Sequence, residues 1–154
     1  MTPRRSAGLL LFRRTERGLE VLLGHMGGPY WTGRGAGAWT VPKGEYGDEE
    51  PARDAARREF REELGLDPPD GEEIPLGEVR QAGGKLVTVW AVEADLDPAA
   101  AVPGTFRMEW PRGSGRHQEF PELDRVEWMD LDRAREVIVS AQTAFLDRLA
   151  EHSG

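Results

Sequence analysis

One stretch constrains the fold of this chain more than any other: PKGEYGDEEPARDAARREFREELGL, which runs from Pro42 to Leu66. Its apolar residues recur at helical spacing, and its later acidic residues share a neighbouring face. The apolar positions are Ala56, Phe60 and Leu64, and the acidic positions are Glu59, Glu62 and Glu63. We therefore expect an amphipathic helix that buries its apolar stripe against a sheet and presents three carboxylates together.

The ends of this helix are marked by residues with known positional preferences. Asp48 can cap the N-terminus, and the two glutamates that follow it would then meet the positive end of the helix dipole. Pro51 is compatible with a first turn because the amides there have no helical partner. Gly65 favours termination, so the helix is predicted to run from just after Asp48 to about Leu64.

The three carboxylates on one helical face would repel each other unless a positive group lay among them. Hard divalent cations that prefer oxygen ligands, Mg²⁺ or Mn²⁺, are the expected partner. A plainer alternative is a solvated acidic face in which Arg57 and Arg61 pair with the flanking carboxylates. The complete spacing of the stretch, with glycines at both ends, favours the cation.

The same stretch fills a known pattern at every position. Its members here are Gly44, Glu50, Arg58, Glu59, Phe60, Glu62, Glu63, Gly65 and Leu66. They form the Nudix box, G-x5-E-x7-R-E-U-x-E-E-x-G-U, in which U is a bulky apolar residue. The chain therefore resembles the Nudix hydrolase family over these 23 residues, and elsewhere in the layout of its elements.

This resemblance implies a fold and an activity. The fold is α+β (α/β layered), a mixed sheet sandwiched between helices, in one domain over residues 1–154. The activity is hydrolysis of a phosphoanhydride in a nucleoside diphosphate linked to another group, with a dinucleoside polyphosphate or nucleoside triphosphate as the expected substrate. The alternatives are a diphosphoinositol polyphosphate hydrolase, an enzyme that removes pyrophosphate from RNA 5′ ends, and a non-catalytic nucleotide sensor.

The resemblance also assigns roles to residues of the box. The implied metal ligands for Mg²⁺ or Mn²⁺ are Glu59, Glu62, Glu63 and the Lys43 carbonyl. Gly44 would let the backbone approach the metal closely. Arg58 would pair with the box carboxylates and fix their rotamers. Glu50 would be an auxiliary residue of the metal site.

The general base is left open between a box glutamate and a carboxylate in the later loop, residues 117–122. That loop, HQEFPE, offers Glu119 and Glu122. We favour Glu119 as a further ligand or base, against the alternative that it is a solvated loop carboxylate.

Several residues are candidates for contact with the substrate. The phosphate candidates are Lys43, His25, Arg80 and Lys85. Trp39 could stack on a base, although a tryptophan in a strand more often belongs to the core. The segment Trp39-x-x-Pro-Lys-Gly44 is similar to the one that precedes the box in diadenosine tetraphosphate and diphosphoinositol polyphosphate hydrolases. Three further aromatic residues flank loops: Tyr30, Trp31 and Trp110. They would either stack on a nucleobase of the substrate or anchor those loops.

Composition limits the remaining possibilities. A net charge of −8 argues against broad binding of DNA, RNA or anionic membranes, and it disfavours the RNA substrate. The absence of cysteine excludes disulfides and thiol chemistry. The apolar run at residues 7–12 is too short for a signal peptide or a membrane span, so we expect a cytoplasmic protein. A homodimer is compatible with the sequence, but no exposed apolar stripe identifies an interface.

Patterning predicts the other elements and the loops between them. The expected strands are 6–13, 19–25, 39–42, 76–81, 85–94, 105–110 and 126–130, and the expected terminal helices are 131–139 and 142–152. Hairpins are expected around residues 16–18 and around Gly83-Gly84. Long loops are expected at residues 26–38, 67–73, 95–104 and 111–117.

Overall fold

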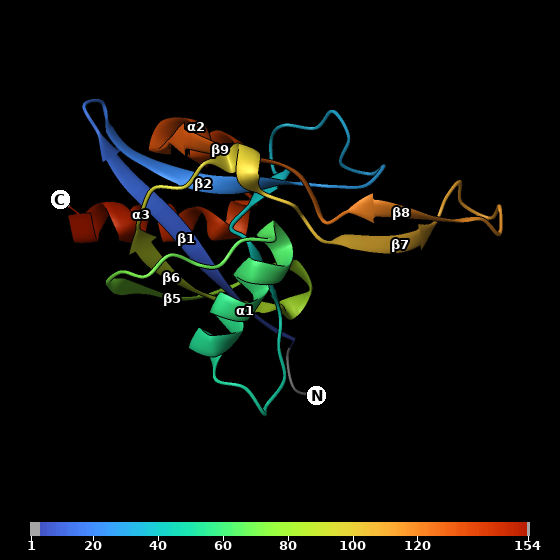
Figure 1. Cartoon of the computed structure of the whole chain (residues 1–154), viewed down its shortest axis with the longest axis horizontal. Coiled ribbons are helices and arrows are strands. Elements are labelled where there is room, and N and C mark those ends of the chain that lie inside the picture. The colour runs from blue at the N-terminus through green and yellow to red at the C-terminus, as the bar shows by residue number, and fades with distance from the viewer. Residues whose placement is uncertain (1–3, 154) are drawn as a thin grey trace.

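The computed structural model describes residues 4–153, which form a mixed β-sheet, three α-helices and a separate β-ribbon (Figure 1). The sheet strands are β1 (Arg5–Thr15), β2 (Gly18–Met26), β3 (Trp39–Thr40), β4 (Lys43–Glu45), β5 (Glu73–Arg80), β6 (Leu86–Glu93) and β9 (Leu123–Asp130). The α-helices are α1 (Ala52–Leu64), α2 (Leu131–Val137) and α3 (Thr143–Ser153). Short 3₁₀ turns occur at η1 (Ala82–Gly84), η2 (Pro98–Ala100) and η3 (Ser140–Gln142).

The sheet combines antiparallel hairpins with one parallel pair. Its strand order is β3-β2-β1-β6-β5, while β4 pairs with β1 and β9 pairs with β2. β1 and β2 form the predicted hairpin, and β5 and β6 form the second one. β1 and β6 run parallel, with Arg5 opposite Leu86 and Phe12 opposite Glu93. The expected mixed sheet is therefore confirmed.

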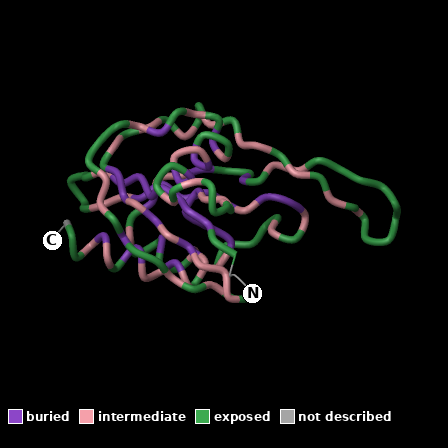
Figure 2. Tube along the Cα trace, turned by 90° about the horizontal axis from the view of Figure 1, so that it is seen from below, coloured by how far each residue is buried: buried purple, intermediate pink, exposed green. Residues whose placement is uncertain are grey.

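Helices cover both faces of this sheet. Side chains alternate between the faces along a strand, so neighbouring residues of β1 enter different cores. Leu9 packs in the cluster that contains Phe60 of α1, and Leu10 packs in the cluster that contains Phe145 of α3. The buried segments run through the middle of the molecule (Figure 2). The apolar stripe predicted for the box helix is buried as expected.

Helix α1 begins later than the sequence predicted. Asp48 does not cap it; the N-cap is Pro51, whose ψ of 146° is extended, and no side chain bonds the first amides. The physical reason is that a residue before proline avoids the helical region, which keeps Glu50 outside the helix. The C-terminal prediction is confirmed, because Gly65 adopts φ 66° and its N–H donates to the Arg61 carbonyl.

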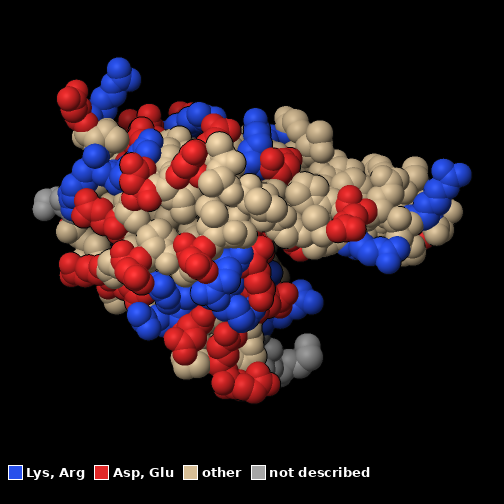
Figure 3. Space-filling model, viewed as in Figure 1, with Lys and Arg blue, Asp and Glu red and all other residues tan. Residues whose placement is uncertain are grey.

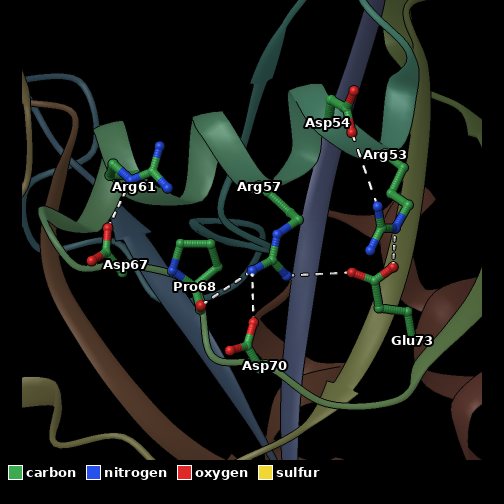
Figure 4. A network of polar contacts seen from close by, with 8 residues as sticks. All are labelled: Arg53, Asp54, Arg57, Arg61, Asp67, Pro68, Asp70 and Glu73. Carbon is green, nitrogen blue, oxygen red and sulfur yellow. Dashed lines mark hydrogen bonds and ion pairs between the residues drawn. The ribbon is translucent and has the colours of Figure 1, made fainter.

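The outer face of α1 is tied to the loop that follows it (Figure 4). Arg53 and Arg57 both pair with Glu73, and Arg61 donates to Asp67 at 2.8 Å. Arg57 and Arg61 had been expected, in the plainer interpretation, to neutralise the box carboxylates. The structure shows that they serve a different face, which leaves the carboxylates to other partners.

A β-ribbon formed by β7 (Thr105–Glu109) and β8 (His117–Pro121) projects from the body (Figure 1). The strand predicted at 105–110 is confirmed. Residues 117–121 had been expected to form a loop and are a strand instead, because they pair with β7 over five positions from Thr105↔Pro121 to Glu109↔His117. Most of the ribbon is exposed (Figure 2).

Acidic and basic side chains are interspersed over the face of the molecule that Figure 3 shows. Within residues 4–153 no helix is both long enough and apolar enough to span a bilayer. The expected lack of nucleic-acid partners stays a prediction.

Candidate active site

A polar pocket of about 380 Å³ forms where α1, β4 and the beginning of β1 meet. Its lining consists of two lysines, four glutamates, a serine and a glycine: Lys43, Lys85, Glu45, Glu59, Glu63, Glu122, Ser6 and Gly44. A slightly larger hollow of about 430 Å³, lined by Arg13 and residues 95–98, contains no residue of the box. The pocket at the box is therefore the candidate site.

Glu59 fits closely against Gly44. The glutamate is only 8% exposed, and a Cβ atom built on Gly44 would lie 1.8 Å from its Oε2. Any larger residue at position 44 would displace this carboxylate. The glycine had been expected to admit a metal; what the structure shows is that it admits the side chain of Glu59.

Arg58 binds three box carboxylates at once. It donates to both oxygens of Glu50 at 2.8 Å, to Glu59 at 2.9 Å and to Glu62 at 3.1 Å. The bond to Glu50 is the main cause of a raised Arg58 pKa, so the guanidinium is permanently charged. Glu62 is 58% exposed and turns to Arg58 instead of lining the pocket.

Glu63 and Glu122 are two further carboxylates that line the pocket. Burial, followed by the charges of Glu122 and Glu59, raises the pKa of Glu63 to about 8, and Lys43 acts in the opposite direction. Burial also raises the pKa of Glu59 and the pKa of Glu122. Three carboxyl groups in this region therefore have raised pKa values, because burial disfavours their charged forms and the positive charge nearby does not offset it.

The pocket offers the oxygen ligands that a Mg²⁺ or Mn²⁺ site needs. Carboxylate oxygens of Glu59, Glu63 and Glu122, with the Lys43 carbonyl, are hard ligands of the kind these ions prefer. Among residues 4–153, no three acidic or histidine side chains converge into a compact ligand cluster. The assignment of a metal site to this pocket consequently rests on the excess of negative charge and on the oxygen ligands that the pocket offers.

Both lysines of the chain line the same pocket. Burial, followed by the charge of Lys85, lowers the pKa of Lys43, while Glu63 and two other glutamates oppose this shift. Gly8 stands opposite Lys43, and a Cβ atom there would lie 2.8 Å from the Lys43 Cβ. The pocket thus holds carboxylate and ammonium groups together.

Three candidate substrate contacts lie elsewhere. His25 is 1% exposed and bonds Asp124 Oδ1 at 2.8 Å and the Arg34 carbonyl at 2.7 Å. Trp39 is 2% exposed and belongs to the core on the α3 side. Arg80 is exposed on β5. The lining of the pocket includes none of the three.

The structure brings Glu122, and not Glu119, to the pocket. Glu119 lies on β8, and its carboxylate accepts a hydrogen bond from Thr105. Glu122 follows the ribbon, where its N–H donates to the Gly104 carbonyl at 2.7 Å and its carbonyl accepts from Gly27 at 3.0 Å. These two backbone bonds hold Glu122 at the base of the ribbon. Glu122, and not Glu119, is therefore the candidate for the further metal ligand or general base.

The aromatic residues flanking the loops form contacts of their own. Tyr30 meets Trp110 edge to face at 5.5 Å, which links the loop after β2 to the ribbon. Trp31 packs against the core, and Arg34 lies 5.9 Å above its ring. The lining of the pocket includes none of these residues, and their contacts link the loops to neighbouring segments.

Ser6 and Glu45 line the pocket and were missed by the sequence analysis. The signal for Ser6 was slight: a small polar residue at the beginning of an otherwise apolar strand. Glu45 was one acidic residue among many near the box.

The fold and the pocket define a class of protein: a mixed sheet between helices, with a carboxylate-bearing helix and two lysines at one site. The sequence matches the family model of the NUDIX domain over residues 2–149. The chain therefore belongs to the Nudix family. A comparison with curated protein sequences gave no match.

Solved structures show the same fold at low sequence identity. The Ap4A hydrolase of C. elegans in a binary complex is 20% identical, with 97% of each chain covered and a TM-score of 0.67. The NUDIX domain of Shewanella oneidensis NrtR, complexed with ADP ribose, is 14% identical over 100% of this chain and 90% of that chain, with a TM-score of 0.65. RenU, a Nudix hydrolase from M. smegmatis, is 25% identical over 99% and 88%, with a TM-score of 0.60.

Proposed function

We propose that this protein is a divalent-metal-dependent pyrophosphohydrolase that cleaves a phosphoanhydride in a nucleoside diphosphate linked to another group. The substrate class that we favour is a dinucleoside polyphosphate or a nucleoside triphosphate. The observation that carries the proposal is the juxtaposition, in one pocket of a Nudix domain, of two box carboxylates and Glu122 with both lysines. Cations held by the carboxylates, together with the two ammonium groups, suit a chain of linked phosphates.

The residues of the pocket divide the work of such a reaction. Glu59, Glu63, Glu122 and the Lys43 carbonyl would hold Mg²⁺ or Mn²⁺. When bound, the ion would neutralise phosphate charge and lower the pKa of a water molecule that it coordinates. Arg58 keeps Glu59 in place through its 2.9 Å bond. The side chains of Lys43 and Lys85 would bind phosphate oxygens.

A carboxylate of the pocket would take the proton of the attacking water. The water oxygen forms a new bond to phosphorus, the bridging P–O bond breaks, and the leaving phosphate keeps the electron pair. Glu63 is the first candidate for this base, because it is a largely buried box carboxylate that lines the pocket. Glu122 is the second candidate, since it lines the same pocket.

The alternative substrates are less well supported. A diphosphoinositol polyphosphate carries many phosphates and would call for a strongly basic pocket, whereas four glutamates face two lysines here. A nucleotide sensor would not need a full set of box carboxylates, and this chain keeps all of them. ADP ribose is nevertheless included in the test, because a structural neighbour was crystallised with it.

The test is a product assay on a substrate panel. Nucleoside triphosphates, dinucleoside polyphosphates, nucleotide sugars and ADP ribose would each be incubated with Mg²⁺, with Mn²⁺ and with EDTA. We expect cleavage that requires the metal. Glu63→Gln should lower kcat by at least about 100-fold, because it removes a metal ligand and a proton acceptor.

Two matched variants test whether Glu122 or Glu119 takes part in the reaction. Glu122→Gln should also lower kcat, whereas Glu119→Gln, the same change outside the pocket, should leave it within about twofold of the wild type. Full activity in Glu63→Gln, or turnover in EDTA, would contradict the proposal. If no compound were cleaved but one bound tightly, the sensor alternative would replace it.

A further inference from the structure

Ser6 carries a buried hydroxyl group that has no hydrogen-bond partner. The residue is 1% exposed, and its Oγ is the one buried side-chain polar atom without a partner among residues 4–153. Buried polar atoms in folded proteins are nearly always hydrogen-bonded. An unpaired hydroxyl on a residue that lines a pocket therefore points to a ligand that completes it.

The sheet places Ser6 on the same side as both lysines. Ser6 pairs with Glu45 of β4 and with Val87 of β6. Lys43 lies two residues from Glu45, and Lys85 lies two residues from Val87, so alternation brings all three side chains to one face. The lining of the pocket, which includes Ser6, Lys43 and Lys85, agrees with this register.

No side chain among residues 4–153 bonds the hydroxyl. Neither lysine donates to the Ser6 Oγ, and an ammonium group has no lone pair with which to accept its proton. The carboxylate of Glu45, opposite Ser6, is paired with Arg4 at 3.5 Å. A ligand at this place would meet three groups that donate hydrogen bonds and would need acceptor oxygens with negative charge.

We propose that Ser6 is a substrate-binding residue whose hydroxyl donates to an oxygen of the same phosphate group that Lys43 and Lys85 bind. This inference rests on the proposed function, because it assumes that the pocket accepts a phosphate chain. It adds a neutral donor at a fixed position on β1 to the two flexible ammonium groups. Strand β1 is held on both sides by neighbouring strands, so the donor is preorganised.

The test compares Ser6→Ala with the wild type, using inorganic tripolyphosphate as the probe in calorimetric titrations with Mg²⁺ and with EDTA. A hydrogen bond to a charged acceptor is lost, so affinity should fall about tenfold. The apparent melting temperature without ligand should be unchanged or higher, because the variant removes a buried hydroxyl that lacks a partner. A hydroxyl with a purely structural role would instead make Ser6→Ala less stable.

Ser114→Ala is the matched control, since Ser114 lies in the exposed turn of the ribbon and accepts only from the Arg116 N–H. It should bind tripolyphosphate like the wild type. Lys85→Ala should weaken binding, and the double variant with Ser6→Ala should lose less than the two single losses combined, because both residues contact one phosphate.

Four results would count against the inference. Equal affinities of wild type and Ser6→Ala, strictly additive losses, no binding by the wild type, or a Ser6→Ala protein that melts earlier would overturn the inference. Binding that behaves as expected, in a protein that cleaves nothing on the substrate panel, would reject the proposed hydrolase while leaving the Ser6 site supported.

Discussion

Gly44 shows how a single residue of the box acts through what it lacks. Its missing side chain makes room for the Glu59 carboxylate, whose Oε2 would lie 1.8 Å from a Cβ atom. Arg58 then holds Glu59 at 2.9 Å from the other side. The position of the most deeply buried box carboxylate is therefore set by a glycine and an arginine of the same motif.

Gly44→Ala should impair the site while leaving the fold intact. The added methyl group forces Glu59 to move, so we expect Mg²⁺ affinity and kcat/KM to fall about 10- to 100-fold. Metal titrations and steady-state kinetics measure the effect. Gly35→Ala is the control, because a Cβ atom at Gly35 meets no atom within 4 Å and its φ is not positive. Equal activities of the two variants would refute the packing argument.

The raised pKa of Glu63 makes stability depend on pH. The ordinary value is 4.5 and the value in the folded protein is about 8, so the folded state keeps a proton that the unfolded chain releases between these values. The stabilisation is fully present below pH 4.5 and is lost as pH rises through 8, with a slope of at most about 1.4 kcal/mol per pH unit. In EDTA, the free energy of unfolding should thus fall between pH 5 and pH 8.

Glu63→Gln isolates this contribution, because glutamine stays neutral at every pH. Urea denaturation of both proteins in EDTA across this range would give two curves, and the difference between them is the contribution of Glu63. We expect the variant to become the more stable protein as pH approaches 8. Parallel curves would show that Glu63 ionises normally in the folded state.

Residue by residue, five of the residues predicted from the sequence line the pocket: Lys43, Gly44, Glu59, Glu63 and Lys85. Glu59, Glu63, Gly44 and Lys43 come together because a helix and the strand before it bring them together locally. Glu122 and His25 could not be assigned in the same way. Their surroundings depend on a ribbon and a loop that meet only in the folded molecule.

At the scale of elements, α1 is positioned by its arginines as well as by its apolar stripe. Arg53 and Arg57 share Glu73, whose side chain is 12% exposed at the beginning of β5 (Figure 4). This contact joins the helix to the sheet across the loop of residues 65–72. The pairing is partly buried, so it is less screened by solvent than an ordinary surface ion pair.

Glu73→Gln should lower the free energy of unfolding by about 1 kcal/mol, because both arginines lose their charged partner. The control is Asp70→Asn, which removes a fully exposed partner of Arg57 in the same network and should change stability by less than about 0.5 kcal/mol. Chemical denaturation measures both. A larger loss in Asp70→Asn than in Glu73→Gln would contradict this ranking.

Elements with local signals were predictable, and elements that depend on distant pairing were not. The hairpin of β1 and β2 and the end of α1 at Gly65 follow from turn and cap residues. Strand β8 had no such signal: its residues HQEFP include three polar residues and a proline, and only pairing with β7 makes them a strand. The beginning of α1 was misplaced because Pro51 blocks the turn before it.

At the scale of the whole molecule, the sheet gathers distant segments into one pocket. Ser6 lies at the beginning of β1, Lys85 precedes β6, and Glu122 precedes β9, while α1 contributes the box carboxylates. Gln142 ties the far side of the molecule to the strand before the box, since its amide bonds Thr40 and the Val41 N–H. The mixed sheet between helices was predictable from the resemblance, but this convergence required the structure.

The central claim is that water attacks a phosphate in this pocket with the help of a divalent cation and Glu63. The most direct test is to run the reaction in ¹⁸O-labelled water with the best substrate of the panel, and to locate the label by mass spectrometry. We predict one labelled oxygen in a phosphate of a product with Mg²⁺, no labelled product with EDTA, and labelled product that forms at least about 100-fold more slowly with Glu63→Gln. Labelled product that forms equally fast in wild type and Glu63→Gln, or that does not require the metal, would contradict the account.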